Sequence, residues 1–238
     1  MADICGIDDI REIFRKRRIR WAASVYGRCL PVLREVAEKI LQERYEGHNV
    51  QFQWMEEEVP LHRRQSFRMG EYSEEGTEEY SDGSRLEEAA AAATRTQATY
   101  LGLHVTVMDA EMTGVHLAMI AGHSRIALDS QSAILRMEQL YIMPARSWIE
   151  LELQKINKKG CTVMWVKGHA GIRGNEEADM KARLKAYGGS VMQTVNRITP
   201  AGIRHDHLIH TKPGHLHWTR KQVRGLTFVT TDRGPMKW

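Results

Sequence analysis

The pattern of apolar and polar positions predicts two helices in the first fifty residues. In residues 8–26, the apolar side chains placed on one face are Ile10, Ile13, Phe14, Trp21 and Val25. A second apolar stripe starts after Pro31 and comprises Val32, Val36, Ile40 and Leu41. Recurrence at three and four residues is the spacing of an amphipathic helix. The simplest interpretation is a helical hairpin that packs on another part of the chain.

From residue 78 onward, short β-rich runs alternate with longer helical patterns. Strands are expected near residues 78–84, 88–94, 98–107, 125–129 and 161–166. Helices are expected near residues 109–121, 130–140, 145–158 and 175–187, the third with Trp148, Leu151 and Ile156 in the core. The five alanines at 89–93 favour a helix by propensity. We nevertheless place them in a tightly packed strand, because the residues from Thr94 to Leu103 turn and continue with β-rich sequence.

Charge divides the chain into three parts. Residues 1–70 carry 13 Lys and Arg against 11 Asp and Glu, residues 71–189 carry 13 against 17, and residues 190–238 carry 8 against 2. We therefore predict a basic helical extension (1–70), an acidic α/β domain (71–189) that begins with a polar linker at 71–79, and a basic, histidine-rich tail (190–238). Basic flanks around an acidic core suit a protein that attracts a polyanion.

Composition limits the cellular setting. The 238 residues are 42% hydrophobic, which is ordinary for a globular protein. No uncharged apolar run approaches 18 residues, so we expect no membrane span and no secretory signal. Cys5, Cys29 and Cys161 form no spacing motif, which fits a reducing compartment, with Cys161 buried in a strand. The expected location is intracellular, in the nucleus or the cytoplasm.

The segment Trp165–Asp179 is the first candidate for chemistry. Glycines at 168, 171 and 174 surround His169, and Asn175 is a suitable N-cap for a helix that contains Asp179. A well-capped surface helix would explain the acids alone. The histidine on a glycine-rich loop beside a carboxylate instead favours a catalytic arrangement.

Three further carboxylates stand at strand ends or helix starts. They are Asp82, Glu111 and Asp129. With Asp179 they form a set of four acids, and converging acids are unfavourable unless cations neutralise them. Magnesium prefers hard oxygen ligands, and two ions about 4 Å apart can stabilise both oxygens of a phosphodiester substitution. The pattern therefore indicates a metal site.

These residues resemble the ribonuclease H family, and specifically the ribonuclease H domains of non-LTR (LINE-type) retroelement polyproteins. The resemblance covers about residues 78–189 and rests on Asp82-Gly83-Ser84, Ala110-Glu111, Leu128-Asp129-Ser130-Gln131, Lys167–Ile172 and Gly174–Asp179. It implies an α/β ribonuclease H-like fold, with a mixed five-stranded sheet flanked by helices and a helical N-terminal extension. It also implies hydrolysis of the RNA strand of RNA–DNA hybrids.

The resemblance assigns roles to individual residues. Asp82, Glu111, Asp129 and Asp179 would hold two Mg²⁺ ions, for which Mn²⁺ can substitute, and His169 would assist proton transfer or product release. Gln131 would contact the minor groove of the hybrid, although a role without substrate contact is equally compatible. Thr106 is similar to the family's phosphate-pocket threonine, but a strand residue chosen for β propensity is the simpler interpretation. Asp109 adds an acid near the site, for which a helix-capping role is expected.

The flanks leave alternatives open. The basic side chains of the first helix could simply form the solvated face of an amphipathic helix. Alternatively, they could contact phosphates or direct nuclear import. The five histidines of the tail, His205, His207, His210, His215 and His217, could bind zinc, but no cysteine accompanies them and a polar loop is expected. Because no polymerase motif occurs, the chain resembles a fragment of a retroelement polyprotein, acting alone or beside a reverse transcriptase. A non-catalytic nucleic-acid-binding remnant is the alternative function.

Overall fold

A six-stranded mixed sheet with helices on both faces forms the centre of the protein. The computed structural model describes residues 10–26, 31–47, 49–53, 55, 58–86, 89–191 and 196–210. The strands are β1 (Val50–Gln51), β2 (Arg68–Gly70), β3 (Glu79–Leu86), β4 (Ala89–Thr94), β5 (Ala98–Gly102), β6 (Arg125–Leu128), β7 (Thr162–Trp165) and β8 (Asn196–Arg197). The helices are α1 (Ile10–Tyr26), α2 (Pro31–Arg44), α3 (Val107–Ile120), α4 (Gln131–Gln139), α5 (Trp148–Ile156), α6 (Arg173–Val191) and α7 (Pro200–His210).

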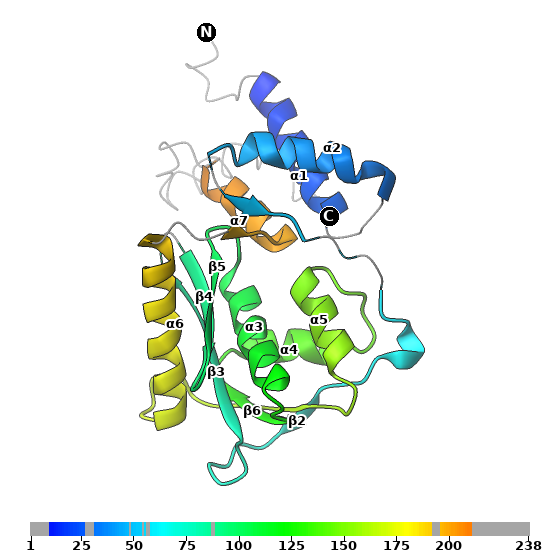
Figure 1. The fold of residues 1–238 in the computed structure, drawn as a ribbon. Coiled ribbons are helices and arrows are strands. Elements are labelled where there is room, and N and C mark those ends of the chain that lie inside the picture. Colours follow the sequence, from blue (N-terminus) through cyan, green and yellow to red (C-terminus); the bar gives the residue numbers. More distant parts are fainter. Residues whose placement is uncertain are drawn as a thin grey trace, which may run out of the picture.

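The strand order in the large sheet is β2-β7-β6-β3-β4-β5. Strands β2, β7, β6 and β3 are parallel, whereas β3, β4 and β5 pair antiparallel. Figure 1 shows α6 on one face of the sheet and α3, α4 and α5 on the other. This arrangement confirms the predicted ribonuclease H-like α/β fold with helices around a mixed sheet.

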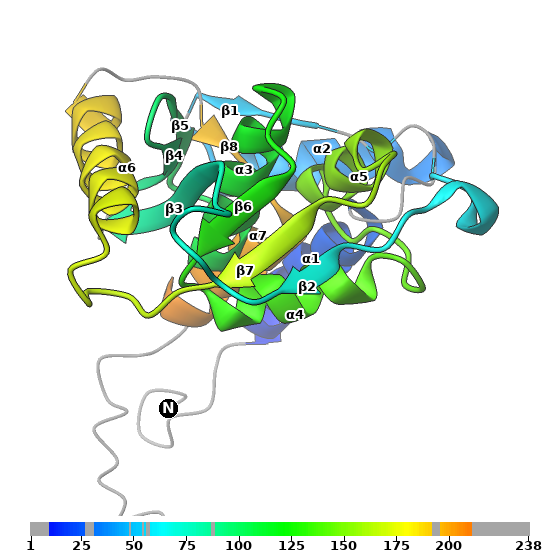
Figure 2. The ribbon, with the colours of Figure 1, turned by 90° about the horizontal axis from the view of Figure 1, so that it is seen from below.

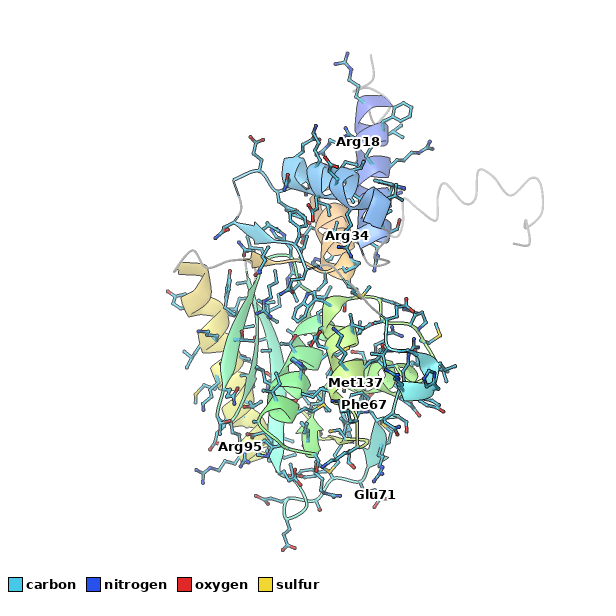
Figure 3. The ribbon with its side chains drawn as sticks, turned by 45° about the vertical axis from the view of Figure 1, so that its right-hand side comes forward. Arg18, Arg34, Phe67, Glu71, Arg95 and Met137 are labelled. Atoms are coloured by element: carbon cyan, nitrogen blue, oxygen red, sulfur yellow. The ribbon has the colours of Figure 1, made fainter. Side chains whose placement is uncertain are left out.

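The predicted sheet lacked one strand. Strand β2 lies beside β7 at the edge of the sheet (Figure 2), in a segment that the sequence placed in the N-terminal extension. Its three residues show no β pattern of their own, and pairing with the longer β7 makes them a strand. Nearby, Phe67 enters the main core with Met137 (Figure 3).

The alanine run forms strand β4, as predicted. Ala89–Ala93 are at most 1% exposed and lie in the sheet between α3 and α6. Small side chains let both helices approach the strand closely. Strand β5 ends earlier than predicted, at Gly102, whose φ of +99° is left-handed. Thr106 then caps α3 and does not continue the strand.

The extension helices pack with α7 at one end of the sheet (Figure 1). Their shared core contains Ile19, Ala22, Leu41, Ile198 and Ile203, among others. Helix α7 was not predicted, since the histidines made this stretch look like a polar loop. Thr199 caps it through its Oγ, which accepts from the Gly202 N–H at 3.0 Å, and Pro200 takes the first helical position.

The predicted inner face of α1 is wrong for its two aromatic residues, whereas Val25 is buried as predicted. Phe14 and Trp21 are 57% and 37% exposed, whereas Ile19, Ala22 and Ala23 are buried. The alanines allow a closer approach to α2 than the aromatic rings would. Of the tail histidines, His205, His207 and His210 lie in α7, and His215 and His217 lie outside the described residues. Cys161 is buried as predicted, directly before β7, while Cys5 and Cys29 are outside the described residues.

No helix in the described part of the chain is long and apolar enough to cross a membrane.

Candidate active site

Three carboxylates from separate elements meet at one place on the sheet. Asp82 lies on β3, Glu111 on α3, and Asp129 directly after β6. Oxygen atoms of the three groups lie within 4.8 Å of one another. Asp82 and Glu111 are 5% and 4% exposed, so the cluster is largely shielded from water.

Asp179 on α6 lies beside Asp82 and helps to raise the pKa of the Asp82 carboxyl. It also lies within 4.8 Å of ligand atoms of His169 and Glu176. The four acids predicted from the sequence are therefore brought together, and His169 is near one of them. Because β3, α3, β6 and α6 each supply one acid, the site exists only in the folded domain.

The close packing of β3 and α3 depends on Gly83. A Cβ atom at this position would lie 2.2 Å from the backbone nitrogen of Glu111. Without it, the Gly83 N–H donates to Glu111 Oε2 at 3.1 Å and fixes that carboxylate beside Asp82. Gly168 plays a similar part in the loop, since its Cβ would lie 2.5 Å from Asp129 Oδ2.

Burial and mutual repulsion raise the pKa of two of the acids. The pKa of Asp82 rises to about 7, first because of burial and then because of the charges of Asp129 and Asp179. The pKa of Glu111 rises to about 9, first because of burial and then because of Asp82 and Asp129. Such a cluster is poorly stable in its fully ionised form unless positive charge is supplied.

Neighbouring side chains form polar contacts with the other two acids, Asp129 and Asp179. Asn175 Nδ2 donates to Asp129 Oδ2 at 3.2 Å, and Trp165 Nε1 donates to the Asp129 backbone oxygen at 3.0 Å. Arg183 Nε lies 2.8 Å from Asp179 Oδ1, one helical turn farther along α6. Sequence reasoning missed these contacts. Asn175 was predicted as an N-cap, but α6 begins two residues earlier, at Arg173, and its side chain reaches the site instead.

The loop from Val166 to Ile172 presents His169 to solvent. His169 is exposed and has a φ of +52°, the only positive φ among the described non-glycine residues. A left-handed histidine is uncommon and is found more often at functional sites than elsewhere. The side chain is thus held near Asp179 on an exposed loop.

Gln131 and Thr106, the two predicted substrate contacts, lie in different environments. Gln131 is the first residue of α4 and is exposed, two residues after Asp129. The Thr106 hydroxyl donates to Asp109 Oδ2 at 2.6 Å and accepts from the Asp109 N–H in a capping box. Asp109 is buried and also accepts from Thr199 Oγ1 at 2.8 Å. Thr106 and Asp109 therefore stabilise the start of α3 and its contact with the segment before α7.

The mixed sheet and the carboxylate cluster on it define a ribonuclease H-like α/β domain. Residues 74–187 match the family model of RNase H, which supports a relationship of this domain to the ribonuclease H family. All four acids and His169 lie inside the matched segment. A search of curated proteins finds no match to the chain. This match supports a nuclease that acts on RNA–DNA hybrids.

The hydrogen bond from Asn175 predicts an effect on metal binding. Replacing Asn175 by alanine is expected to weaken the affinity for Mn²⁺ by about 10- to 100-fold, because the amide would no longer orient the Asp129 carboxylate toward a bound ion. Isothermal titration calorimetry measures this affinity. Gln139→Ala, at the exposed end of α4, is the matched control. Equal affinities for Asn175→Ala and wild type would contradict a supporting role for Asn175.

Proposed function

We propose that this protein is a metal-dependent endoribonuclease that hydrolyses the RNA strand of RNA–DNA hybrids. The observation that carries the proposal is the convergence of Asp82, Glu111 and Asp129 within 4.8 Å, with the carboxyl group of Asp179 beside Asp82. A set of four acids, of which Asp82 and Glu111 are buried and have raised pKa values, is unfavourable for a purely structural role. Two divalent cations would make the set favourable.

The residues fit magnesium better than a softer metal. The donors are carboxylate oxygens, which Mg²⁺ and Mn²⁺ prefer, and no described cysteine accompanies them. Asp82, Glu111, Asp129 and Asp179 would hold the two ions. When bound, the ions supply Lewis-acid stabilisation of the charge that develops on the phosphodiester.

The protein's own residues would orient the reacting groups. Gly83 and Asn175 hold the carboxylates of Glu111 and Asp129 in place, so that little reorganisation is needed when substrate binds. From the exposed loop, His169 would transfer a proton to the leaving group or assist release of the product. Gln131, exposed beside the cluster, would contact the minor groove, where ribose hydroxyls distinguish RNA from DNA.

We further propose that the domain derives from a non-LTR retroelement and acts beside a reverse transcriptase. The support is the set of motifs around the acids, above all Lys167–Ile172 and Gly174–Asp179. In that setting the enzyme would remove the RNA template after DNA synthesis.

The proposal is tested by comparing duplexes. The wild-type protein is incubated with labelled RNA–DNA hybrid, double-stranded RNA and double-stranded DNA, in Mg²⁺, Mn²⁺ or EDTA. We expect cleavage of the RNA strand of the hybrid alone, with 3′ hydroxyl and 5′ phosphate ends, and none in EDTA. Hybrid binding without cutting in either metal would replace this proposal with the non-catalytic remnant.

The role of His169 has its own test. We expect His169→Ala to slow turnover by about 10- to 100-fold while hybrid affinity is retained, since general acid–base assistance has about this magnitude or more. His169→Asn is the companion variant, because asparagine tolerates the left-handed φ and preserves the loop. Single-turnover kinetics and binding are measured for both. Unchanged turnover in both variants would remove the histidine from the mechanism.

A further inference from the structure

Helix α1 presents an aromatic and cationic face outside the core that it shares with α2 and α7. Its buried face consists of small or aliphatic side chains, Ile19, Ala22 and Ala23, against α2 and α7. The aromatic residues Phe14 and Trp21 lie away from this core and are 57% and 37% exposed. Burial of the rings would have given more hydrophobic stabilisation than burial of the alanines.

The exposed rings share one stripe with an arginine. Phe14, Arg17 and Trp21 follow each other at spacings of three and four residues, which places them along one side of the helix. Arg17 is exposed between the two rings. A guanidinium between two aromatic faces is an arrangement suited to a strand of alternating phosphates and bases.

The helix carries positive charge that its partner helix does not balance. Residues 10–26 contain six cations, Arg11, Arg15, Lys16, Arg17, Arg18 and Arg20, and a single acid, Glu12. Helix α2 has three cations and three acids and therefore no net charge, and its Glu43 pairs with Arg18 of α1 at 3.5 Å. Arg11 with Arg15 and Lys16 with Arg20 are like-charge pairs at four residues, which destabilise an isolated helix. Figure 3 shows Arg18 at the α1 end of the molecule, remote from Glu71.

We propose that this face of α1, formed by Phe14, Arg17, Arg20 and Trp21, binds single-stranded nucleic acid. The arginines would contact phosphates, and bases would stack on the two rings. Stacking on aromatic side chains within a basic surface is the general way in which proteins hold unpaired strands, because every base has a flat face. In a duplex the bases already stack on one another, so the rings favour a single strand.

Two other partners fit the face less well. A membrane-surface helix needs a free apolar face to insert between lipids, and the apolar face of α1 is occupied by α2 and α7. An acidic protein would pair with the cationic side chains, but it would not explain why two aromatic rings separated by an arginine are exposed. The charge and the rings together favour nucleic acid.

The test measures binding by fluorescence anisotropy with a labelled oligothymidylate of about 20 nucleotides, in EDTA. The full chain is used. Without divalent cations the carboxylate cluster repels phosphates, and DNA is no substrate for the proposed cleavage, so the outcome is independent of the proposed function. We expect Phe14→Leu with Trp21→Leu to weaken binding by about tenfold or more, since leucine keeps the helix but removes the rings.

The cationic part of the face is tested by salt. Arg17→Gln with Arg20→Gln is expected to weaken binding and to reduce the slope of log affinity against log salt by about 1.4, or about 0.7 for each lost phosphate contact. Lys158→Gln with Lys159→Gln makes the same charge change in the exposed loop before β7 and should leave the affinity within about twofold. Tyr141→Leu, an exposed ring after α4, is the control for the aromatic pair.

Several results would overturn the proposal. One is an unchanged oligonucleotide affinity in both α1 variants. Another is a loss of affinity in the lysine and tyrosine controls that is as large as the loss in the α1 variants. Co-sedimentation with anionic vesicles that depends on Phe14 and Trp21, without oligonucleotide binding, would assign the face to a lipid surface. Loss of a dimer in the leucine variant, again without oligonucleotide binding, would assign it to self-association. Thermal unfolding of each variant separates these outcomes from misfolding.

Discussion

The metal-free protein is expected to lose stability as the pH rises from about 4 to about 9, and divalent cations should restore it. The folded state raises the pKa of Asp82 to about 7 and of Glu111 to about 9, from ordinary values of 3.8 and 4.5. Between those limits the folded state binds more protons than the unfolded state, so the stability contribution is complete at low pH and is lost as the pH rises. The loss is on the order of a few kcal/mol.

Chemical denaturation at several pH values, in EDTA and in Mg²⁺, measures this effect. Mg²⁺ should raise the free energy of unfolding at pH 8 and have little effect at pH 5, where the acids keep their protons. Asp82→Asn removes one repelling charge and should flatten the pH dependence in EDTA. A pH-independent stability between pH 5 and 8 in EDTA would contradict repulsion within the cluster. Carboxylates whose pKa is lowered by partners, such as Asp206, change the free energy of unfolding only at more acidic pH.

Replacing Gly83 by alanine is expected to cost about 3 kcal/mol or more of stability and to abolish tight metal binding. The added methyl group would meet backbone atoms of Ala110 and Glu111, which cannot move as a side-chain end can. Strand β3 and helix α3 must separate, which shifts Asp82 from Glu111 and breaks the hydrogen bond from the Gly83 N–H.

The matched control for that variant is Gly188→Ala. Gly188 lies in α6, and a Cβ atom there would meet nothing within 4 Å. The change should stabilise the protein by about 0.5–1 kcal/mol, because alanine favours a helix more than glycine does. Thermal unfolding of the two variants should therefore shift in opposite directions. Equal, small shifts would mean that the packing of β3 on α3 is loose.

The alternation of short β-rich runs with helical patterns predicted the central elements well. Strands β3, β4 and β6 and helices α3 and α6 all fall close to the predicted ranges. The four carboxylates were found because ligands of a hard metal must be acids near strand ends.

Elements defined by tertiary contacts could not be predicted in this way. Strand β2 is three residues long and owes its form to β7. Helix α7 did have a local signal, Thr199 followed by Pro200, but the histidine content of the region outweighed it in the prediction. Phe14 and Trp21 were wrongly placed on the inner face of α1 because hydrophobicity alone was considered, whereas close packing with α2 selected small side chains.

The supporting residues of the site were missed for a similar reason. Asn175 and Arg183 are ordinary polar residues of a helix by sequence, and only the fold brings them to Asp129 and Asp179. The N-cap interpretation of Asn175 placed the start of α6 two residues late.

The central claim is that the four carboxylates hold divalent cations and that the protein uses them to cleave the RNA strand of RNA–DNA hybrids. Its most direct test is the rate of cleavage of a labelled hybrid by wild type and by Asp82→Asn in Mg²⁺. Glu152→Gln, on the exposed side of α5, is the control. We predict a loss of about 10³-fold or more for Asp82→Asn, in a protein that remains folded, and no loss for the control. Equal cleavage by wild type and Asp82→Asn would contradict the account.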